Sequence, residues 1–483
     1  MGEMHVPDDA MYGAQTQRAV ENFGTEGGIS GRTMHPHFVH SLGLVKKACA
    51  VANRKLGKFK GRDKDVAAII EAADEVHSGK HDSQFVVEIF QTGSGTSSNM
   101  NANEVISNLA ILKVGGKLGS RSPVHPNDDV NMGQSSNDVI PTTLKVAAAT
   151  RLKAKLVPAL TKLHKALDEK AREWDDIVKS GRTHLMDATP VTLGQVFSGY
   201  AAQVKKGIER SQRALDALTE LALGGTAVGT GINTPQNFPG ATIKQLAEWT
   251  GIPFVEAPNH FEAQAAQDGV VEAHGQLKAI AASLFKIAND IRLLGSGPRA
   301  GLAEIIIPPV APGSSIMPGK VNPVMAEAMT MAAARVMGND VTINMAGASG
   351  QFELNVFLPV MSEAMLESID VLAGASAKFA EKCVAGLVAD REQIDRLLQG
   401  NMIVATALNE LIGYDAAAKL VKTAYNNGQG RRTVRDVAVE MIKAGELKTH
   451  DGSRVVTVEE LDAGLAMKKM TKPDPPIKPH EEL

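Results

Sequence analysis

The chain has few cysteines, few aromatic residues and no long apolar run. Its 483 residues include two cysteines, Cys49 and Cys383, with no CxxC spacing. We therefore expect no disulfide framework, and we interpret both cysteines as small core residues in a reducing compartment. No apolar run is long enough to span a membrane. The start, MGEMHVPDDAMYGAQTQRA, lacks a signal-peptide core and the Arg/Ser-rich character of a transit peptide. These absences predict a soluble, cytoplasmic protein.

The chain also has no excess of one charge. Its 51 Lys and Arg residues nearly balance 54 Asp and Glu residues, giving a net charge of -3. There is no basic stripe with interleaved aromatics, so a nucleic-acid partner is not expected. The length is too great for one small core, which indicates two or three domains or one elongated scaffold with end caps.

Long helices dominate the sequence pattern. Only 4% of residues are aromatic, and abundant alanine favours closely packed helices over strands. Apolar residues recur every three or four positions from Leu277 to Leu294 and from Leu156 to Leu167, and a third long helix is expected from Val191 to Leu221. Short alternating runs near Val124 and Val455 predict minor hairpins. The fold class is therefore mainly α, with a central long-helix bundle.

We predict four segments along the chain. Residues 1–134 form an N-terminal domain with anion-binding loops, and residues 135–360 form the long-helix bundle that carries GRTHL and GSSIMPGKVNP. Residues 361–472 form a small C-terminal domain in which the helices become shorter. Residues 473–483 form a disordered tail rich in proline.

One loop, GSSIMPGKVNPVMAE, is too rich in Gly and Pro to be a regular helix. Gly313 and Gly319 allow unusual backbone angles, while Pro318 and Pro323 fix φ. The loop combines two hydroxyls, a cation and an amide, at Ser314, Ser315, Lys320 and Asn322. Such a set suits an anion from which a proton must be moved. The alternative is an ordinary Gly/Pro connection, which would be favoured if no other polar cluster were present.

Two further polar clusters each precede a helical pattern. They are QTGSGTSSNMNANEV at 91–105 and HPNDDVNMGQSSNDVIPTT at 125–143. Polar residues at a helix start cap free N–H groups, and those groups attract a carboxylate or phosphate. Plain capping accounts for one or two residues, but not for Ser94, Thr96, Ser135, Ser136 and Asn137 together. GSGTSS lacks the GK[ST] ending of a phosphate loop, so nucleotide binding is not expected.

A histidine marks the third cluster, KSGRTHLMDATPVTLGQ at 179–195. His184 follows Thr183, and histidine suits acid or base work near neutral pH. A lone histidine is more often structural, so the two readings are evenly balanced for this cluster alone. The other histidines lie in HPHFVH at 35–40 and at His77 and His81, where Pro36 and Gly79 interrupt any helix that would align them. We expect no catalytic metal.

These motifs together resemble the fumarase/aspartase superfamily. GSSIMPGKVNP is similar to the signature GSSxMPxKxNP, and the other clusters match class II fumarases in the same order, from residue 2 to the low 470s. The resemblance implies a three-domain fold and reversible anti hydration of fumarate to L-malate in the tricarboxylic acid cycle, without metal or organic cofactor. It also implies a homotetramer whose active sites are each shared between three subunits.

The resemblance also implies roles for individual residues. Ser314 would be the base that removes the C3 proton of malate, and Lys320 and Asn322 would hold the charge of the aci-carboxylate. His184, paired with Glu327, would handle the proton of the departing hydroxyl. Substrate binding would involve Ser94, Gly95, Thr96, Ser135, Ser136, Asn137, Thr183, Ser315, Lys320 and Asn322, and a secondary dicarboxylate site would involve His125, Pro126, Asn127 and Asp128.

Two alternatives stay open. The first is an aspartate ammonia-lyase of the same superfamily, whose members typically carry Gln at the position of His184 and Ala at that of Gly319. The second is a scaffold that has lost catalysis, which would usually show erosion of the polar loop residues. Departures from the family pattern are Gly133 in place of a frequent Ser, and Ser122 with Arg121 before the secondary site. The start at MGEMHVP is also shorter than is usual, which we interpret as a shortened or misassigned start.

Overall fold

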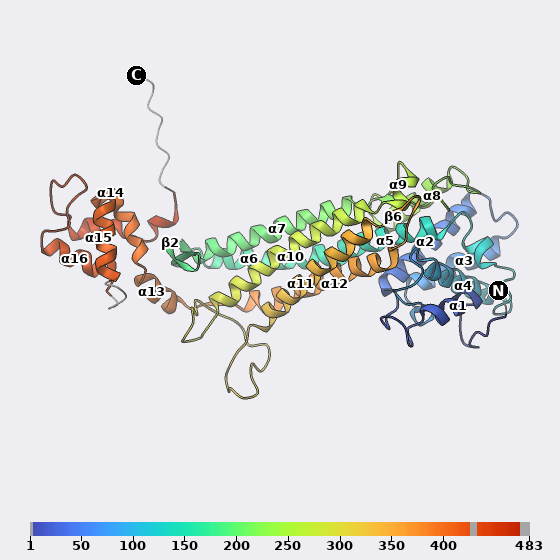
Figure 1. The fold of residues 1–483 in the computed structure, drawn as a ribbon, viewed down its shortest axis with the longest axis horizontal. Helices are drawn as coiled ribbons and strands as arrows, with labels where there is room; N and C mark the ends of the chain where they lie inside the picture. The colour runs from blue at the N-terminus through green and yellow to red at the C-terminus, as the bar shows by residue number, and fades with distance from the viewer. Residues whose placement is uncertain (1–2, 426–431, 474–483) are drawn as a thin grey trace, which may run out of the picture. The chain divides into compact units, whose positions relative to one another are not determined.

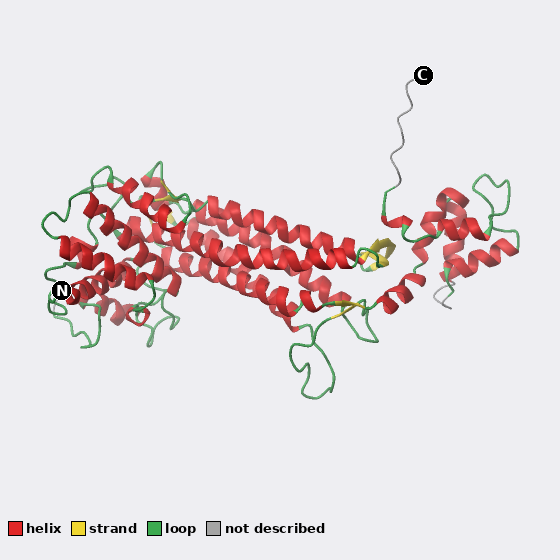
Figure 2. Ribbon diagram, turned by 180° about the vertical axis from the view of Figure 1, so that it is seen from behind, coloured by secondary structure: helices red, strands yellow, loops and turns green. Residues whose placement is uncertain are grey.

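The computed structural model describes residues 3–425 and 432–473, and these residues are mainly helical (Figures 1 and 2). The predicted mainly α fold is confirmed. Two compact units are present. Unit 1 comprises Met1–Thr161, Lys206–Phe285 and Met329–Ser376, and unit 2 comprises Lys162–Lys205, Lys286–Ala328 and Ala377–Leu483.

Among the described residues, five long helices have residues in both units. They are α6 (Val157–Glu173), α7 (Leu193–Asp216), α10 (Asp268–Leu294), α11 (Val324–Gly347) and α12 (Leu358–Lys382) (Figure 1). In unit 1, buried His274 of α10 bonds Asp340 of α11 at 3.0 Å and Ser368 of α12 at 2.9 Å. In unit 2, Tyr200 of α7 donates to Asp290 of α10 at 2.9 Å. Side chains from these helices therefore meet within each unit, as expected for a bundle.

The long-helix predictions need three corrections. The predicted helix Val191 to Leu221 is shorter, because β2 (Met186–Thr192) precedes α7 and β3 (Glu220–Leu221) pairs with β4 (Val255–Glu256). The helical turn Leu152–Leu156 before α6 is a π-helix. The predicted shortening of the helices begins later than Met361, because α12 continues to Lys382 and the described helices after it are short. The predicted boundary at 360/361 falls inside α12, and the division into domains stays a prediction.

The remaining helices of unit 1 include a largely buried pair, α4 and α5. They are α1 (Ala14–Phe23), α2 (Pro36–Lys55), α3 (Asp63–His77), α4 (Thr96–Lys113), α5 (Ser136–Arg151), α8 (Phe238–Thr250) and α9 (His260–Ala265). Helix α2 packs against α3, α5 and α8, and α3 packs against α4. Helices α4 and α5 are buried on nearly all sides, so their polar residues need partners inside the unit. The hairpin β6 (Gly350–Gln351) and β7 (Leu354–Asn355) also belongs to unit 1.

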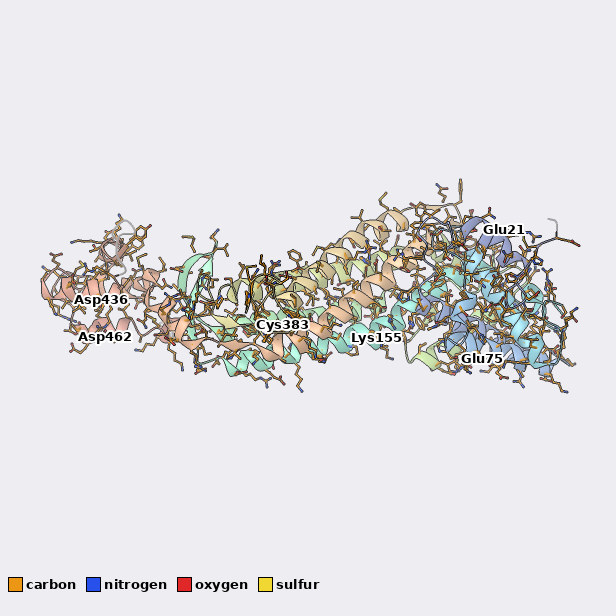
Figure 3. All side chains as sticks on the ribbon, turned by 90° about the horizontal axis from the view of Figure 1, so that it is seen from below. Glu21, Glu75, Lys155, Cys383, Asp436 and Asp462 are labelled. Carbon is orange, nitrogen blue, oxygen red and sulfur yellow. The ribbon has the colours of Figure 1, made fainter. Side chains whose placement is uncertain are left out.

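Unit 2 contains an antiparallel hairpin and small helices. The hairpin pairs β1 (Val178–Thr183) with β2, and β5 (Ile305–Ile306) pairs with β8 (Val388–Ala389). The small helices are α13 (Arg391–Gln399), α14 (Asn409–Ile412), α15 (Tyr414–Tyr425), α16 (Val434–Lys443) and α17 (Val458–Gly464). Arg435 of α16 donates to Asp462 of α17 at 2.7 Å, and Figure 3 labels Asp462 beside Asp436, which closes the capping box of α16. The Arg435–Asp462 pair joins the two helices over a shared apolar core.

The minor predictions have mixed outcomes. Val455 pairs with Lys448 through a single antiparallel bridge, whereas Val124 lies in a loop and the hairpin predicted there is wrong. The predicted tail, 473–483, lies outside the described residues except for Pro473. Among residues 3–425 and 432–473, no helix combines the length and the apolar character needed to cross a membrane.

Candidate active site

Two helix N-termini of unit 1 carry one group of predicted site residues. Gly95 caps α4 with φ +71°, a left-handed angle that favours glycine. A Cβ at this position would also come within 2.8 Å of Ile140 of α5. Ser135 caps α5, and its side chain and that of Asp138 complete a capping box. Both helices therefore begin with ordered polar turns, as predicted.

A chain of hydroxyl groups joins these two helix starts. Ser94 Oγ lies 2.8 Å from Thr96 Oγ1, and Thr96 Oγ1 lies 2.7 Å from Ser136 Oγ. The backbone N–H of Asn137 donates to Ser135 Oγ at 3.2 Å. The structure thus brings together Ser94, Gly95, Thr96, Ser135, Ser136 and Asn137. Hydroxyls at two helix N-termini form an arrangement suited to carboxylate binding.

One segment of this group was not predicted from the sequence. Asn137 Nδ2 donates to the carbonyl of Ala227 at 2.8 Å, and Asp138 Oδ2 accepts the N–H groups of Gly224 and Thr226, both at 3.0 Å. Asp138 is fully buried, and burial raises its pKa to about 6 despite those N–H donors. The glycine-rich run GGTAVGTG was the signal that could have indicated a shaped loop here.

The hairpin of unit 2 presents His184 at its tip. Thr183 and Met186 are paired, which leaves His184 and Leu185 as a two-residue turn with φ of +57° and +62°. Such a turn usually carries Asn or Gly, and positive φ costs other residues about 1–3 kcal/mol each. Thr183 and His184 are both exposed. The strained backbone therefore holds an acid/base side chain out from the hairpin.

A buried ion cluster holds the base of this hairpin. Glu304 is fully buried, and its carboxylate accepts hydrogen bonds from both terminal nitrogens of Arg182, at 2.9 and 3.0 Å. Lys179 Nζ lies 3.2 Å from the same carboxylate. Burial lowers the pKa of Lys179, and the Glu304 charge opposes that shift. Removing one member of a buried cluster leaves the others uncompensated. Arg182, which belonged to a predicted catalytic cluster, is thus an anchor within unit 2.

Glu304→Gln is expected to destabilise the protein by about 3 kcal/mol or more, because buried Lys179 and partly buried Arg182 lose their counter-charge. The midpoint of denaturant unfolding measures this effect. The matched control is Glu209→Gln on the exposed surface of α7, which should leave the midpoint unchanged. Equal midpoints for the two variants would show that the cluster does not anchor the hairpin.

The loop before α11 contains the predicted base. Ser314 Oγ accepts the backbone N–H groups of Ile316, at 3.2 Å, and Met317, at 2.9 Å. Two N–H donors on one hydroxyl oxygen stabilise negative charge there and so favour the alkoxide. Ser314 is half-buried, while Ser315 and Lys320 are exposed. The serine is therefore accessible and its oxygen already carries two donors.

The two ends of this loop are tied together. Asn322 Nδ2 donates to the carbonyl of Gly313. A Cβ at Gly313 would lie 1.6 Å from the carbonyl oxygen of Lys320, so only glycine fits this close approach. Gly319, with φ +78°, makes the turn between them. The loop is thus closed by the contact between Asn322 and Gly313, and Ser314 lies next to this contact. The Gly/Pro pattern predicted such a shaped loop.

Glu327 lies in the first turn of α11, where a carboxylate is favoured by the helix dipole. It belongs to unit 2, as do Thr183, His184, Ser314, Ser315, Lys320 and Asn322. The predicted site residues at the starts of α4 and α5 belong to unit 1. The pairing of Glu327 with His184 stays a prediction.

The residues predicted for a secondary dicarboxylate site also lie together in unit 1. His125 caps the π-helical turn Pro126–Val130, and its Nδ1 accepts the N–H of Asp128 at 3.1 Å. Arg62 donates to the neighbouring Asp129 at 2.6 Å. Asn127 and Asp128 are exposed. Arg62 and His125 therefore hold the turn in place, and its exposed residues face solvent. The negative charge of Asp128 opposes the binding of an anion there.

Among the described residues, no group of three or more His, Cys, Asp or Glu side chains could hold a metal ion. His40 bonds Asp82 at 2.9 Å and His81 bonds Glu75 at 3.0 Å, each within a separate pair. His77 Nδ1 donates to the carbonyl oxygen of His40 at 2.9 Å. The absence of a catalytic metal stays a prediction that solution experiments must test.

Family models match most of the chain. A lyase family model matches residues 2–338, and a model of the fumarase C C-terminus matches residues 404–472. The chain is 51% identical to a class II fumarate hydratase of Corynebacterium efficiens over 475 residues, which are 98% of this chain and 96% of that protein. It is 52% identical to the mitochondrial fumarate hydratase of Homo sapiens over 441 residues, 91% of this chain and 85% of that protein.

Solved structures give the same assignment. The crystal structure of a class II fumarase from Schistosoma mansoni has a TM-score of 0.90 at 37% identity and covers 97% of both chains. A fumarate lyase:delta crystallin from Brucella melitensis, in a crystal bound to cobalt, has a TM-score of 0.89 at 41% identity and covers 98% of both chains. With these matches and the motifs in the same order, the chain belongs to the class II fumarases of the fumarase/aspartase superfamily.

Proposed function

We propose that the chain catalyses the reversible anti hydration of fumarate to L-malate, as a hydro-lyase of the tricarboxylic acid cycle. The observation that carries the proposal is Ser314 Oγ, which accepts two backbone N–H groups in an exposed loop. A serine hydroxyl is a weak base, and donors that stabilise its alkoxide are what this reaction requires. Relatives with about half of their residues identical are named fumarate hydratases.

In the proposed mechanism, Ser314 takes the C3 proton of malate. The electron pair moves into the adjacent carboxylate and forms the aci-carboxylate, whose extra charge Lys320 and Asn322 stabilise. Asn322 Nδ2 carries two hydrogens, so it can bond Gly313 and still donate to a substrate oxygen. The C2 hydroxyl then leaves, and His184, oriented by Glu327, returns a proton to it to form water. The products are fumarate and water.

Substrate carboxylates would be held by the residues of the two helix starts. The joined hydroxyls of Thr96 and Ser136 support this role, since they lie where α4 and α5 expose their N-terminal N–H groups. Thr183 and Ser315 are proposed as further ligands of the substrate. We propose a weaker, secondary dicarboxylate site at His125, Pro126, Asn127 and Asp128, because the exposed turn keeps its imidazole and amide.

The experiment that tests the function is a comparison of two substrates. Fumarate absorbance is followed in the ultraviolet with L-malate or with L-aspartate supplied. We expect fumarate to form from malate and not from aspartate. Formation from aspartate alone would establish the ammonia-lyase alternative, and no formation from either would favour a scaffold.

We expect prolonged treatment with a chelator to leave the malate dehydration rate unchanged. The proposed steps use only side chains and backbone N–H groups, and require no metal. The rate before and after dialysis against the chelator measures this. A loss of activity that a divalent metal restores would contradict the metal-independent mechanism.

We also propose a cytoplasmic homotetramer in which three subunits contribute to each active site. Exposed apolar side chains on α11, such as Met331, Val341 and Met345, support an interface between copies. The two cysteines are buried and unpaired, which suits a reducing compartment. Dilution to monomers should abolish activity. Sedimentation that shows a fully active monomer would contradict shared sites.

A further inference from the structure

Lys46 of α2 is a fully buried lysine in unit 1. Its Nζ donates to Asn131 Oδ1 at 2.8 Å and to Gln134 Oε1 at 2.9 Å. Both acceptors are neutral amides, and within the described part of the chain no carboxylate forms an ion pair with Lys46 within 4.0 Å. A buried ammonium group with no carboxylate in direct contact is costly. The cost needs a reason beyond packing.

The two amides belong to the segment 131–134, which leads directly into Ser135. A second residue of α2, Asn53, donates to the carbonyl of Met132 at 3.0 Å. The spacing of seven places Lys46 and Asn53 on the same face of α2, two turns apart. Gln134 Nε2 bonds the carbonyls of Val130 and Met132 at 3.1 and 3.2 Å. Helix α2 therefore holds the segment 131–134, which immediately precedes the start of α5, through hydrogen bonds.

The same contacts reach the start of α4. Asn99, in the first turn of α4, donates from Nδ2 to Asn131 Oδ1 at 3.2 Å. Asn131 Oδ1 thus accepts hydrogen bonds from Lys46 and from Asn99 of α4, and the chain continues from Asn131 to the start of α5. Lys46 is therefore connected through Asn131 to the start of α4 by hydrogen bonds, and to the start of α5 along the chain.

The charge of Lys46 has an electrostatic consequence. The N-termini of α4 and α5 are positive dipole ends, so a cation nearby adds to their positive potential. Burial lowers the pKa of Lys46 to about 7, and the Asp138 carboxylate, together with Cys49, opposes that shift. An anion bound at the two helix starts would stabilise the charged form of Lys46 in the same way. By reciprocity, charged Lys46 would strengthen the binding of that anion.

We propose that Lys46 is a positioning residue for substrate carboxylate binding, which holds segment 131–134 in place and supplies a buried positive charge behind the starts of α4 and α5. The proposal rests on the proposed function, because it assigns the ligand of these helix starts as a carboxylate of fumarate or malate. Lys46 itself would not touch the substrate.

The test is Lys46→Met, with Lys47→Met as the matched control. Lys47 is the next residue along the chain but bonds Asp74 at 2.7 Å and lies over the Trp249 ring. We expect Lys46→Met to raise the KM for fumarate about tenfold, with kcat per folded active site changed by less than about threefold. Lys47→Met should leave both constants unchanged.

This division between KM and kcat separates positioning from general destabilisation. A purely structural role would lower the folded fraction, and hence the apparent kcat, while KM stayed the same. An unchanged KM in a folded Lys46→Met enzyme would therefore overturn the proposal. Circular dichroism and the unfolding midpoint of each variant establish the folded fraction.

If Lys46→Met does not fold, Gln134→Met decides the question, since it removes one acceptor of Lys46 from a half-buried loop. Its KM should rise about threefold or more, and titration calorimetry with succinate, a non-reacting dicarboxylate, should show weaker binding. Wild-type affinity for succinate would refute the proposal. Failure of the proposed function gives a different result, because the wild-type enzyme would then form no fumarate from malate.

Discussion

Ser314→Ala is expected to lower kcat for malate dehydration about a thousandfold, with little change in KM. The hydroxyl is the only group of the proposed mechanism that accepts the C3 proton, and a positioned base contributes about 10²–10⁴-fold. Its oxygen accepts N–H groups from Ile316 and Met317, so alanine removes the stabilised alkoxide while the loop keeps its glycine and proline turns. Initial rates of fumarate formation measure the loss.

The control for this prediction is Ser198→Ala. Ser198 is an exposed serine of α7 in the same unit, and its hydroxyl donates to the carbonyl of Gln195 at 2.7 Å. Its loss should leave kcat unchanged. The helical content of both variants should match that of the wild type. A Ser314→Ala enzyme with near-normal turnover would assign the base to another residue and remove the observation on which the proposed function depends.

His184→Gln is expected to lower kcat about a hundredfold, the usual contribution of one general acid or base. Glutamine keeps an N–H donor of similar reach but cannot deliver a proton to the departing hydroxyl. The turn holds this residue at φ +57°, and glutamine has no better preference for that angle, so the backbone cost is similar. Malate dehydration and the reverse hydration should decline together, because both pass through the same transition state.

The control is His164→Gln on α6. His164 Nδ1 lies 3.2 Å from the carbonyl of Ala201, so its role is structural and the rates should hold. Steady rates in His184→Gln would show that the proton of the hydroxyl group is handled elsewhere. Gain of aspartate deamination in that variant would indicate that this position also separates hydratases from ammonia-lyases.

The site could be predicted from sequence where its residues are close together in the chain. In the loop 313–322, Gly and Pro restrict the backbone, and Asn322 donates to the carbonyl of Gly313, next to Ser314. The capping of α5 by Ser135 and Asp138 is local in the same way. Such contacts span less than ten residues, so composition alone indicates them.

Contacts between distant residues could not be predicted in this way. Asp138 and Asn137 join the segment Gly224–Ala227 to the site, about ninety residues later in the chain. The hydroxyl contact of Thr96 with Ser136 and the burial of Lys46 likewise depend on how α2, α4 and α5 pack. Nothing in the local pattern distinguishes Lys46 from Lys47, although one is buried and the other bonds a surface carboxylate.

The amino-acid sequence by itself determined the helical class, the polar helix starts and the shape of the loop around Ser314. These follow from apolar periodicity, capping and the backbone limits of Gly and Pro, which act over a few residues. The tertiary structure decided which side chains became buried and which helix starts met, and so which charges support the site. Burial and electrostatic coupling depend on distances in space, and those exist only once the helices have packed.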